Sequence, residues 1–300
     1  MNLRGILSTI ILSAIALVLT VTTVILTPLP LMLVRRNGGR LNFFIASLLG
    51  LGFIAWFGTP SIMVLFSAAV ILTFVFCECE NQNIGYSTAA FVSLLVVSGL
   101  GTIALGVVIQ NNGFEPASFF TAQIDGALAQ LKLPAGIKID KDALVKQIPS
   151  ALLIMVIFSI WLSSILVSRV EKLLGWVPTK QKHIFASSEL RNWKLPDSFV
   201  WIALAAAAGT FFNKVEPESV HWLATNVFNV AVMLYFFQGL AVIVDFFIVK
   251  QVSVFWRAMA YFFIFSQLFL MVAFLGFVDL WMGFRNRQKS DKSAARNFGE

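Results

Sequence analysis

The sequence predicts an all-α fold, a polytopic bundle of transmembrane helices with short amphipathic helices at the membrane surface. Hydrophobic residues make up 58% of the 300 residues, charged residues make up 12%, and the mean hydropathy is +0.85. Soluble domains contain about 25% charged residues. Long apolar segments also recur along the whole chain, as in proteins that cross a bilayer repeatedly. We therefore expect a single integral membrane domain over residues 1–300, with about eight spans and a range of seven to nine.

Segments without charged residues define the expected spans. A transmembrane helix needs about 20 mostly apolar residues, with a range of roughly 17 to 25. Two long segments contain only three formal charges, Asp245, Arg257 and Asp279, and cover residues 221–249 and 254–284. Six segments contain no charge at all: 6–34, 41–57, 61–77, 86–109, 151–167 and 199–212. Of these, the last is short for a span and the first is long.

The first segment follows the basic start "MNLR". Its apolar run is much longer than the roughly 7 to 15 residues of a cleavable signal core, which favours an uncleaved first span. Pro28 and Pro30 should interrupt its helix, because proline removes a backbone donor and clashes with the preceding turn. The segment is then either one long span or a full span followed by a short re-entrant or tilted helix.

The positions of Lys and Arg bear on sidedness, since cytoplasmic loops carry the excess of both. Eight single spans place 11 of these residues on each side of the membrane. If the first segment is a hairpin and 199–212 does not cross, the division becomes 16 inside and 6 outside. The second count favours cytoplasmic termini, with residues 285–300 as a disordered basic tail beside an anionic leaflet.

Residues 111–149 are expected to form an amphipathic connection outside the membrane. Pro116 suits the first turn of a helix. That helix would place Phe120, Ile124, Leu128 and Leu131 along one apolar face. Asp140 suits the N-cap of a second short helix that ends before Pro149. The two helices either lie at the membrane surface as a structural connection or form a lid over a cavity.

Residues 169–197 form a basic and aromatic loop. Trp176 and Trp193 fit the interfacial belt of a membrane protein, and the Lys and Arg residues fit contact with lipid headgroups. Basic residues mixed with aromatic ones also occur in proteins that bind nucleic acid. Because the chain is so apolar, we expect the lipid bilayer as its partner and no nucleic acid.

Polar residues inside the last two long segments are the candidate ligand-binding residues. An antiparallel hairpin that turns near residue 252 would bring six of them to three levels: Asn226 and Asn229 with Asp279, Gln238 with Gln267, and Asp245 near Arg257. They are either interhelical hydrogen bonds, typically worth about 0.6 kcal/mol each, or a site for a small solute or ion. Gly239 and Gly276 would allow close helix packing in both cases.

Signatures of catalysis and of metal binding are scarce. The two histidines, His183 and His221, form no His-Glu-x-x-His pair, and the chain has no Gly-rich phosphate loop and no serine nucleophile elbow. Cys77 and Cys79 in "CECE" could hold a soft metal only with a further ligand. We therefore expect no enzyme, no catalytic residues, no metal site and no cofactor.

Three blocks of the C-terminal third carry a resemblance to a family. "WKLPDSFVW" at 193–201, "NVFNVAVMLYFFQGLAVIVDFF" at 226–247 and "LGFVDLWMGFRNR" at 275–287 resemble the YybS-like bacterial membrane proteins, which have no assigned activity. "PLPLMLVRRNGG" at 28–39 is similar to the proline-bounded short helix of S components of energy-coupling-factor vitamin transporters. The resemblance implies a multi-pass protein of the bacterial cytoplasmic (inner) membrane and assigns no substrate.

Two functions fit these features. The first is a solute-binding or permease-like transport subunit for a small-molecule solute, in which Asn226, Gln238 and Asp279 line a closed pocket. The alternative is a non-catalytic membrane scaffold or assembly factor of the bacterial envelope, with an apolar or small-residue groove open to a partner. Without an internal repeat, a transport subunit would work with other membrane subunits, and ATP-driven transport would need a separate ATPase.

Overall fold

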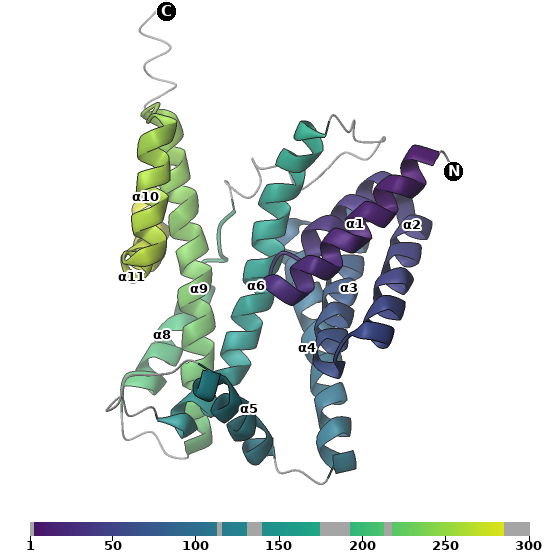
Figure 1. Ribbon diagram of the computed structural model, residues 1–300. Helices are drawn as coiled ribbons and strands as arrows, with labels where there is room; N and C mark the ends of the chain where they lie inside the picture. The colour runs from purple at the N-terminus through teal and green to yellow at the C-terminus, as the bar shows by residue number, and fades with distance from the viewer. Residues whose placement is uncertain (1–2, 113–115, 131–139, 175–192, 213–217, 285–300) are drawn as a thin grey trace, which may run out of the picture. The chain divides into compact units, whose positions relative to one another are not determined.

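The computed structural model describes residues 3–112, 116–130, 140–174, 193–212 and 218–284, and every regular element among them is an α-helix (Figure 1). The all-α prediction is confirmed. The chain forms two compact units, Met1–Ser187 and Ser188–Glu300, which we call unit 1 and unit 2. Most of the expected basic loop and the expected basic tail, 175–192 and 285–300, lie outside the described residues.

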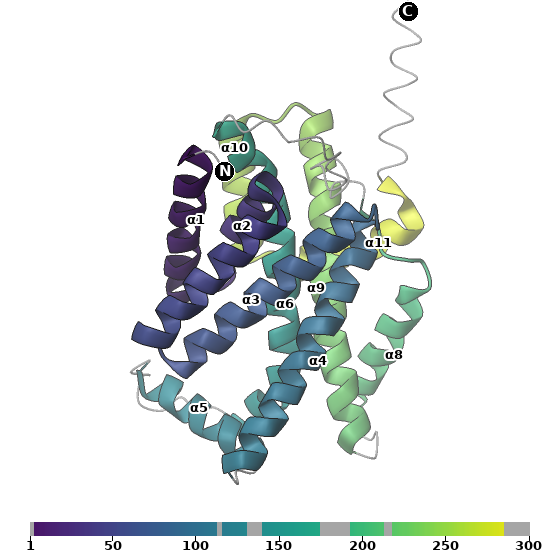
Figure 2. The same cartoon turned by 90° about the vertical axis from the view of Figure 1, so that its right-hand side faces the viewer.

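Unit 1 is a helical bundle with an aromatic core. Neighbouring helices along the chain pack side by side from α1 to α4, and α6 packs against α2 and α4 (Figure 2). Phe43, Phe66 and Phe76 are fully buried at its centre. Its helices are α1 (Leu3–Thr22), α2 (Pro28–Phe57), α3 (Pro60–Asn81), α4 (Tyr86–Asn112), α5 (Pro116–Gln130) and α6 (Lys141–Leu173).

The predicted interruption of the first segment is confirmed, and a second interruption follows it. The helix ends at Thr22 and a new helix begins at Pro28, in the first-turn position that proline tolerates. The second break is at Gly39, with φ 76° and ψ −172°, a backbone conformation that is essentially restricted to glycine. α2 therefore consists of a short helix over 28–38 and a longer one over 40–57.

The start of α6 confirms one prediction and corrects another. Asp140 caps the helix as expected, since its carboxylate accepts a 3.0 Å hydrogen bond from the Ala143 amide. The helix does not end before Pro149 but continues through it to Leu173. A proline costs an interior helix one hydrogen bond, and the long apolar run that follows keeps the chain helical. The connection thus consists of α5 and the first turns of α6.

Unit 2 contains α8 (Phe199–Phe211), α9 (Glu218–Val249), α10 (Val254–Ser266) and α11 (Phe269–Met282). α9 packs against both α8 and α11. The expected continuous helix over 254–284 is wrong, because α10 and α11 meet at an angle of 100° at Gln267 and Leu268. Both of these amides donate to the Phe263 carbonyl, at 2.9 and 3.1 Å, which closes α10 and turns the chain.

The expected eight spans exceed the number that the described helices support. Five helices are long and apolar enough to cross a membrane, or six if the bent pair α10 and α11 counts as one span. The shorter apolar helices, Ser8–Thr22 and Phe199–Phe211, account for the difference. Charge exclusion finds apolar segments but does not show where a helix breaks. The sidedness of the loops stays a prediction.

Candidate functional site

Gln238 is the most deeply buried of the six predicted site residues. Its side chain has no exposed surface. Its Oε1 accepts a 3.1 Å hydrogen bond from the Leu195 amide, and its Nε2 donates a 3.0 Å hydrogen bond to the Gly276 carbonyl. The amide thus joins α9, α11 and the segment before α8, as expected for interhelical hydrogen bonding.

Two glycines bring the backbones of α9 and α11 into contact beside Gln238. A Cβ atom added to Gly239 would lie 2.0 Å from the Val272 carbonyl oxygen, and one added to Gly276 would lie 2.0 Å from that of Tyr235. Such close approach is typical of small residues at helix interfaces in membranes. The predicted role of these glycines is confirmed.

The predicted hairpin register is wrong. Gln238 meets Gly276 on α11, whereas the register placed it level with Gln267. Gln267 is exposed at the break between α10 and α11. The difference arises because the 100° bend at Gln267 and Leu268 redirects the second half of the segment, α11, which packs along α9. The Arg257 guanidinium donates to the carbonyls of Val252 and Phe247, at 2.7 and 3.4 Å.

The remaining predicted residues lie on α9 and α11. Asn226, Asp245 and Asp279 are buried, and Asn229 is half-buried. The Asn226 amide donates a 2.9 Å hydrogen bond to the Trp222 carbonyl one turn earlier. Each of these four residues also takes part in further interactions. Their role in binding a ligand stays a prediction.

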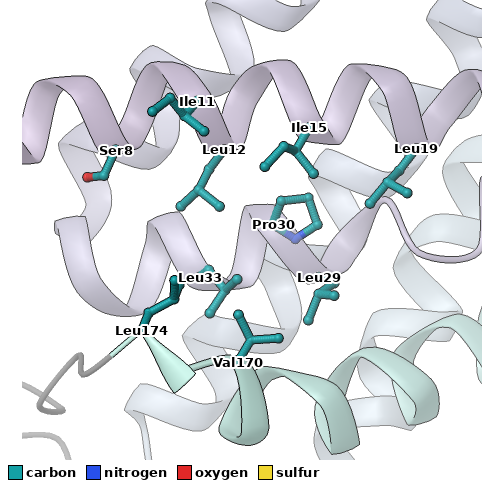
Figure 3. A pocket seen from close by; sticks show the side chains of 10 residues that line it. All are labelled: Ser8, Ile11, Leu12, Ile15, Leu19, Leu29, Pro30, Leu33, Val170 and Leu174. Atoms are coloured by element: carbon teal, nitrogen blue, oxygen red, sulfur yellow. The ribbon is translucent and has the colours of Figure 1, made fainter. Parts of the chain in front are cut away.

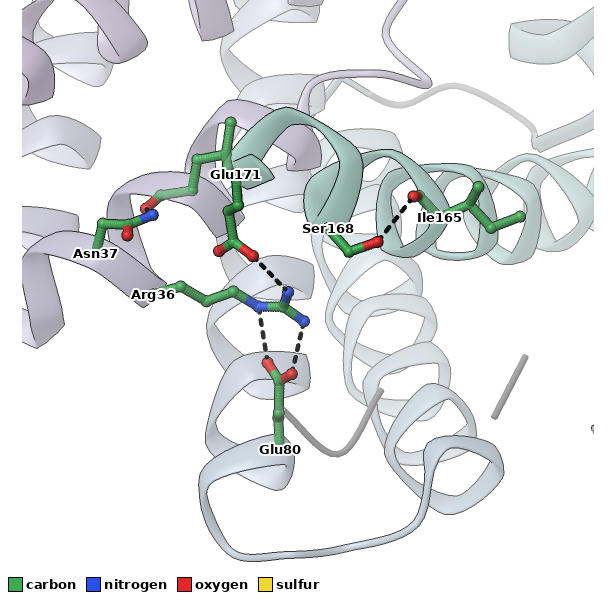
Figure 4. Close-up of polar contacts among 7 residues, drawn as sticks. Arg36, Asn37, Glu80, Ile165, Ser168 and Glu171 are labelled. Carbon is green, nitrogen blue, oxygen red and sulfur yellow. Dashed lines mark hydrogen bonds and ion pairs between the residues drawn. The ribbon is translucent and has the colours of Figure 1, made fainter. Parts of the chain in front are cut away.

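Unit 1 contains a group of six charged residues that we call the ion-pair layer. Within it, Arg36 donates two hydrogen bonds to the Glu80 carboxylate, Nε to Oε2 at 3.2 Å and Nη2 to Oε1 at 2.6 Å (Figure 4). The Arg36 guanidinium also lies 3.8 Å from Glu171, measured from Nη1 to Oε2. The members are Arg35, Arg36 and Arg40 from α2, Glu78 and Glu80 from α3, and Glu171 from α6.

Glu78 connects the two halves of α2. It pairs with Arg35, which precedes the break at Gly39, and with Arg40, which follows it. Both arginines hydrogen-bond to its carboxylate. Arg35 is buried, whereas the side chain of Arg40 is 67% exposed. The two ion pairs of Glu78 thus stabilise the break in α2 at Gly39.

The ion-pair layer was not predicted from the sequence. The three arginines indicated only sidedness there, and "CECE" suggested only a pair of thiols. The available signal was that arginines and glutamates both lie at the ends of uncharged segments. Cys77 and Cys79 are buried free thiols. Among the described residues, no group of three or more His, Cys, Asp and Glu residues is arranged to hold a metal.

A groove of about 390 Å³ lies between α1, α2 and α6 in unit 1 (Figure 3). We call it the α1–α2–α6 groove. Ser8 and Leu174 lie at one end, and Leu19 and Leu29 lie at the other. Ser8 is the single polar residue of a lining that consists of Ser8, Ile11, Leu12, Ile15, Leu19, Leu29, Pro30, Leu33, Val170 and Leu174.

The groove and the ion-pair layer are adjacent in the helices that form them. Leu33 of the groove precedes Arg36 by one turn of α2, and Val170 precedes Glu171 directly in α6. Asn37 lies one turn beyond Leu33 on the same face of α2 and donates a 3.1 Å hydrogen bond to its carbonyl. An apolar surface therefore ends next to polar and charged groups.

A family model described as "Predicted membrane protein (DUF2232)" matches residues 6–280. The chain belongs to this family. The description agrees with the apolar helices and gives a membrane protein without a stated activity. No curated protein and no solved structure matches the chain.

The part of this DUF2232 protein that matches the family model contains all three features described above. It includes the whole α1–α2–α6 groove, every member of the ion-pair layer and the contact between Gln238 and Gly276. The groove is the concave feature among them, and it is distinct from the predicted site on α9 and α11.

Proposed function

We propose that this DUF2232 protein is a non-catalytic, solute-binding subunit of the bacterial cytoplasmic membrane. Its ligand is an amphiphile with one apolar chain, held in the α1–α2–α6 groove. The observation that carries the proposal is the size and lining of the groove, about 390 Å³ and apolar except for Ser8. Pockets for small molecules have volumes of about 300–1,000 Å³.

The polar end of the groove explains why the ligand should be an amphiphile. Lipid tails are as apolar as leucine, so an apolar chain gains little when it leaves the bilayer for an apolar groove. Selective binding then depends on shape and on a polar headgroup. Ser8 at one end of the lining supplies a hydrogen-bonding group for such a headgroup.

The partners of such a subunit follow from the sequence. The chain has no Gly-rich phosphate loop, so transport driven by ATP would use a separate ATPase together with other membrane subunits. The similarity of residues 28–39 to the short helix of energy-coupling-factor S components supports this arrangement. One wall of the groove belongs to that short helix, through Leu29, Pro30 and Leu33.

The proposal is tested by photolabelling with a diazirine derivative of palmitic acid in phosphatidylcholine vesicles. We expect the label to concentrate on the groove peptides around Ile15 and Val170, above its density at Trp56, which is 82% exposed and reports on bulk lipid contact. Ile15 lines the groove and is 43% exposed, so the larger side chain of Ile15→Trp should occupy the groove. This variant should lose several-fold of the groove label.

Ile10→Trp is the matched control. Ile10 is on the same helix, is 50% exposed and does not line the groove. It should label like the wild type, so that a general effect of added tryptophan is separated from filling of the groove. Equal label density at the groove and at Trp56, unchanged by Ile15→Trp, would show that the groove holds only bulk lipid and would refute the proposal.

A specific observation on α4 supports the alternative function, a non-catalytic membrane scaffold or assembly factor. Cβ atoms added at Gly99, Gly101 and Gly106 would meet no atom within 4 Å among the described residues. Gly99 and Gly106 lie about two turns apart on the same face of α4, and small residues on an open helix face allow another membrane helix to approach closely. The alternative predicts that Gly106→Ile lowers the mass of the complex isolated in gentle detergent. An unchanged mass would count against it.

A further inference from the structure

Arg36 is shared unequally between two buried carboxylates. Its guanidinium forms two hydrogen bonds with Glu80, whereas the nearest atom of Glu171 lies 3.8 Å away, beyond hydrogen-bond distance. Both glutamates are buried, with 8% and 5% of their surface exposed. Glu80 already neutralises Arg36, so an ionised Glu171 would add a second negative charge to one positive charge.

The surroundings of Glu171 provide little compensation for that charge. The Asn37 side chain interacts with the carboxyl group, but Oε1 has no hydrogen-bond partner of normal geometry within the described chain. Glu171 also lies in the last turn of α6, which ends at Leu173. The partial negative charge of a helix C-terminus disfavours a carboxylate at that position.

Other ionisable groups surround this end of α6, on the same helix and on its neighbours. Arg35 and Arg40 are both paired with Glu78. Arg169 and Lys172 are exposed to the surroundings. Among the described residues, the ionisable groups on the helices packed around this end of α6 are Arg35, Arg36 and Arg40 on α2, Cys77, Glu78, Cys79 and Glu80 on α3, Tyr86 on α4, and Arg169 and Lys172 on α6 itself.

We propose that Glu171 is a proton-binding site and carries a proton in the folded protein at neutral pH. A buried carboxyl group without sufficient hydrogen bonds or counter-charge is more stable in its neutral form. When Glu171 is protonated, Arg36 keeps both of its hydrogen bonds to Glu80. Loss of the proton would make α3 and α6 compete for the same guanidinium, which couples proton release to the packing of these two helices against α2.

Infrared spectroscopy tests the inference directly, because a protonated carboxylic acid has a carbonyl stretch that an ionised carboxylate lacks. At pH 7, the wild-type spectrum minus that of Glu171→Gln should contain this band, and deuterium oxide should shift it to lower frequency. The band should disappear as the pH is raised. A difference spectrum without the band would overturn the inference.

Two further variants separate proton binding from simple burial. Glu80→Gln removes the competitor and frees Arg36 to pair with Glu171, so the acid band should be lost at pH 7. Glu78→Gln changes a carboxylate of the same layer that pairs with Arg35 and Arg40, so the band should remain. If burial alone set the protonation state, the band would persist in both variants.

A measurement on the wild type covers the case in which Glu171→Gln does not fold. Glutamate labelled with ¹³C at the side-chain carboxyl should shift the acid band to lower frequency, whereas labelled aspartate should leave it in place. A wild-type band that moves only with labelled aspartate, or the lack of any acid band at pH 7, would overturn the inference without any mutation.

Discussion

The contact between α9 and α11 leads to a prediction of large magnitude for Gly276→Ala. The new Cβ atom would lie 2.0 Å from the Tyr235 carbonyl oxygen, and ordinary contact begins at 3.4 Å. The helices must therefore separate by roughly 1.4 Å, the difference between these values. Overpacking of this kind typically costs about 1–3 kcal/mol.

The same movement breaks a buried hydrogen bond. The Gln238 amide donates to the Gly276 carbonyl at 3.0 Å, and separation of the helices takes this distance past the hydrogen-bonding range. A buried amide without its partner costs about 1–3 kcal/mol. Together the two effects should lower the free energy of unfolding by about 2–6 kcal/mol.

The assay is reversible unfolding in mixed detergent micelles, followed by tryptophan fluorescence. Gly101→Ala is the control, because its Cβ atom meets no atom within 4 Å in the described chain. Alanine should stabilise that helix by about 0.5–1 kcal/mol. If Gly276→Ala were as stable as Gly101→Ala, the conclusion that the backbones of α9 and α11 are in contact at Gly276 would be refuted.

Three other substitutions test the polar contacts and the break in α2. Gln238→Leu should cost about 1–3 kcal/mol and speed hydrogen exchange at the Leu195 amide, which loses its acceptor; unchanged exchange there would contradict this. Arg36→Met should cost about 3–5 kcal/mol by removing the arginine partner of the buried Glu80 carboxylate, whereas Arg40→Ala, at a 67% exposed side chain, should cost about 1 kcal/mol or less; equal losses in the detergent titration would refute the difference in burial. Gly39→Ala should cost about 1–3 kcal/mol because of its positive φ, and wild-type stability would show that the turn is absent.

Local chemistry made several helix boundaries predictable. Pro28 marks the start of α2 and Asp140 caps α6, because both effects depend on one residue and its nearest neighbours. Uncharged segments likewise indicated the apolar helices. The bend between α10 and α11 was not predictable in this way, since Gln267 and Leu268 are neither proline nor glycine. The incorrect register of the candidate site followed from that bend.

Features formed by distant parts of the chain were also missed. The contact between Arg36 and Glu80 joins residues 44 positions apart, and each residue alone resembles an ordinary charge at the end of a span. The α1–α2–α6 groove depends on how three apolar helices diverge, and apolar composition does not reveal such a shape. By contrast, the contact of Gly239 and Gly276 was anticipated, because small residues on neighbouring helices indicate close packing.

Native mass spectrometry with added palmitic acid tests the central claim, the binding of an amphiphile in the α1–α2–α6 groove. Wild-type protein released from gentle detergent should carry the fatty acid, Ile15→Trp should lose it, and Ile10→Trp should keep it. Asn229→Ala and Asp279→Ala should also keep it, because both positions lie on α9 and α11 in unit 2. Loss of the adduct in these two variants, with binding by Ile15→Trp intact, would contradict the account and favour the polar site on α9 and α11.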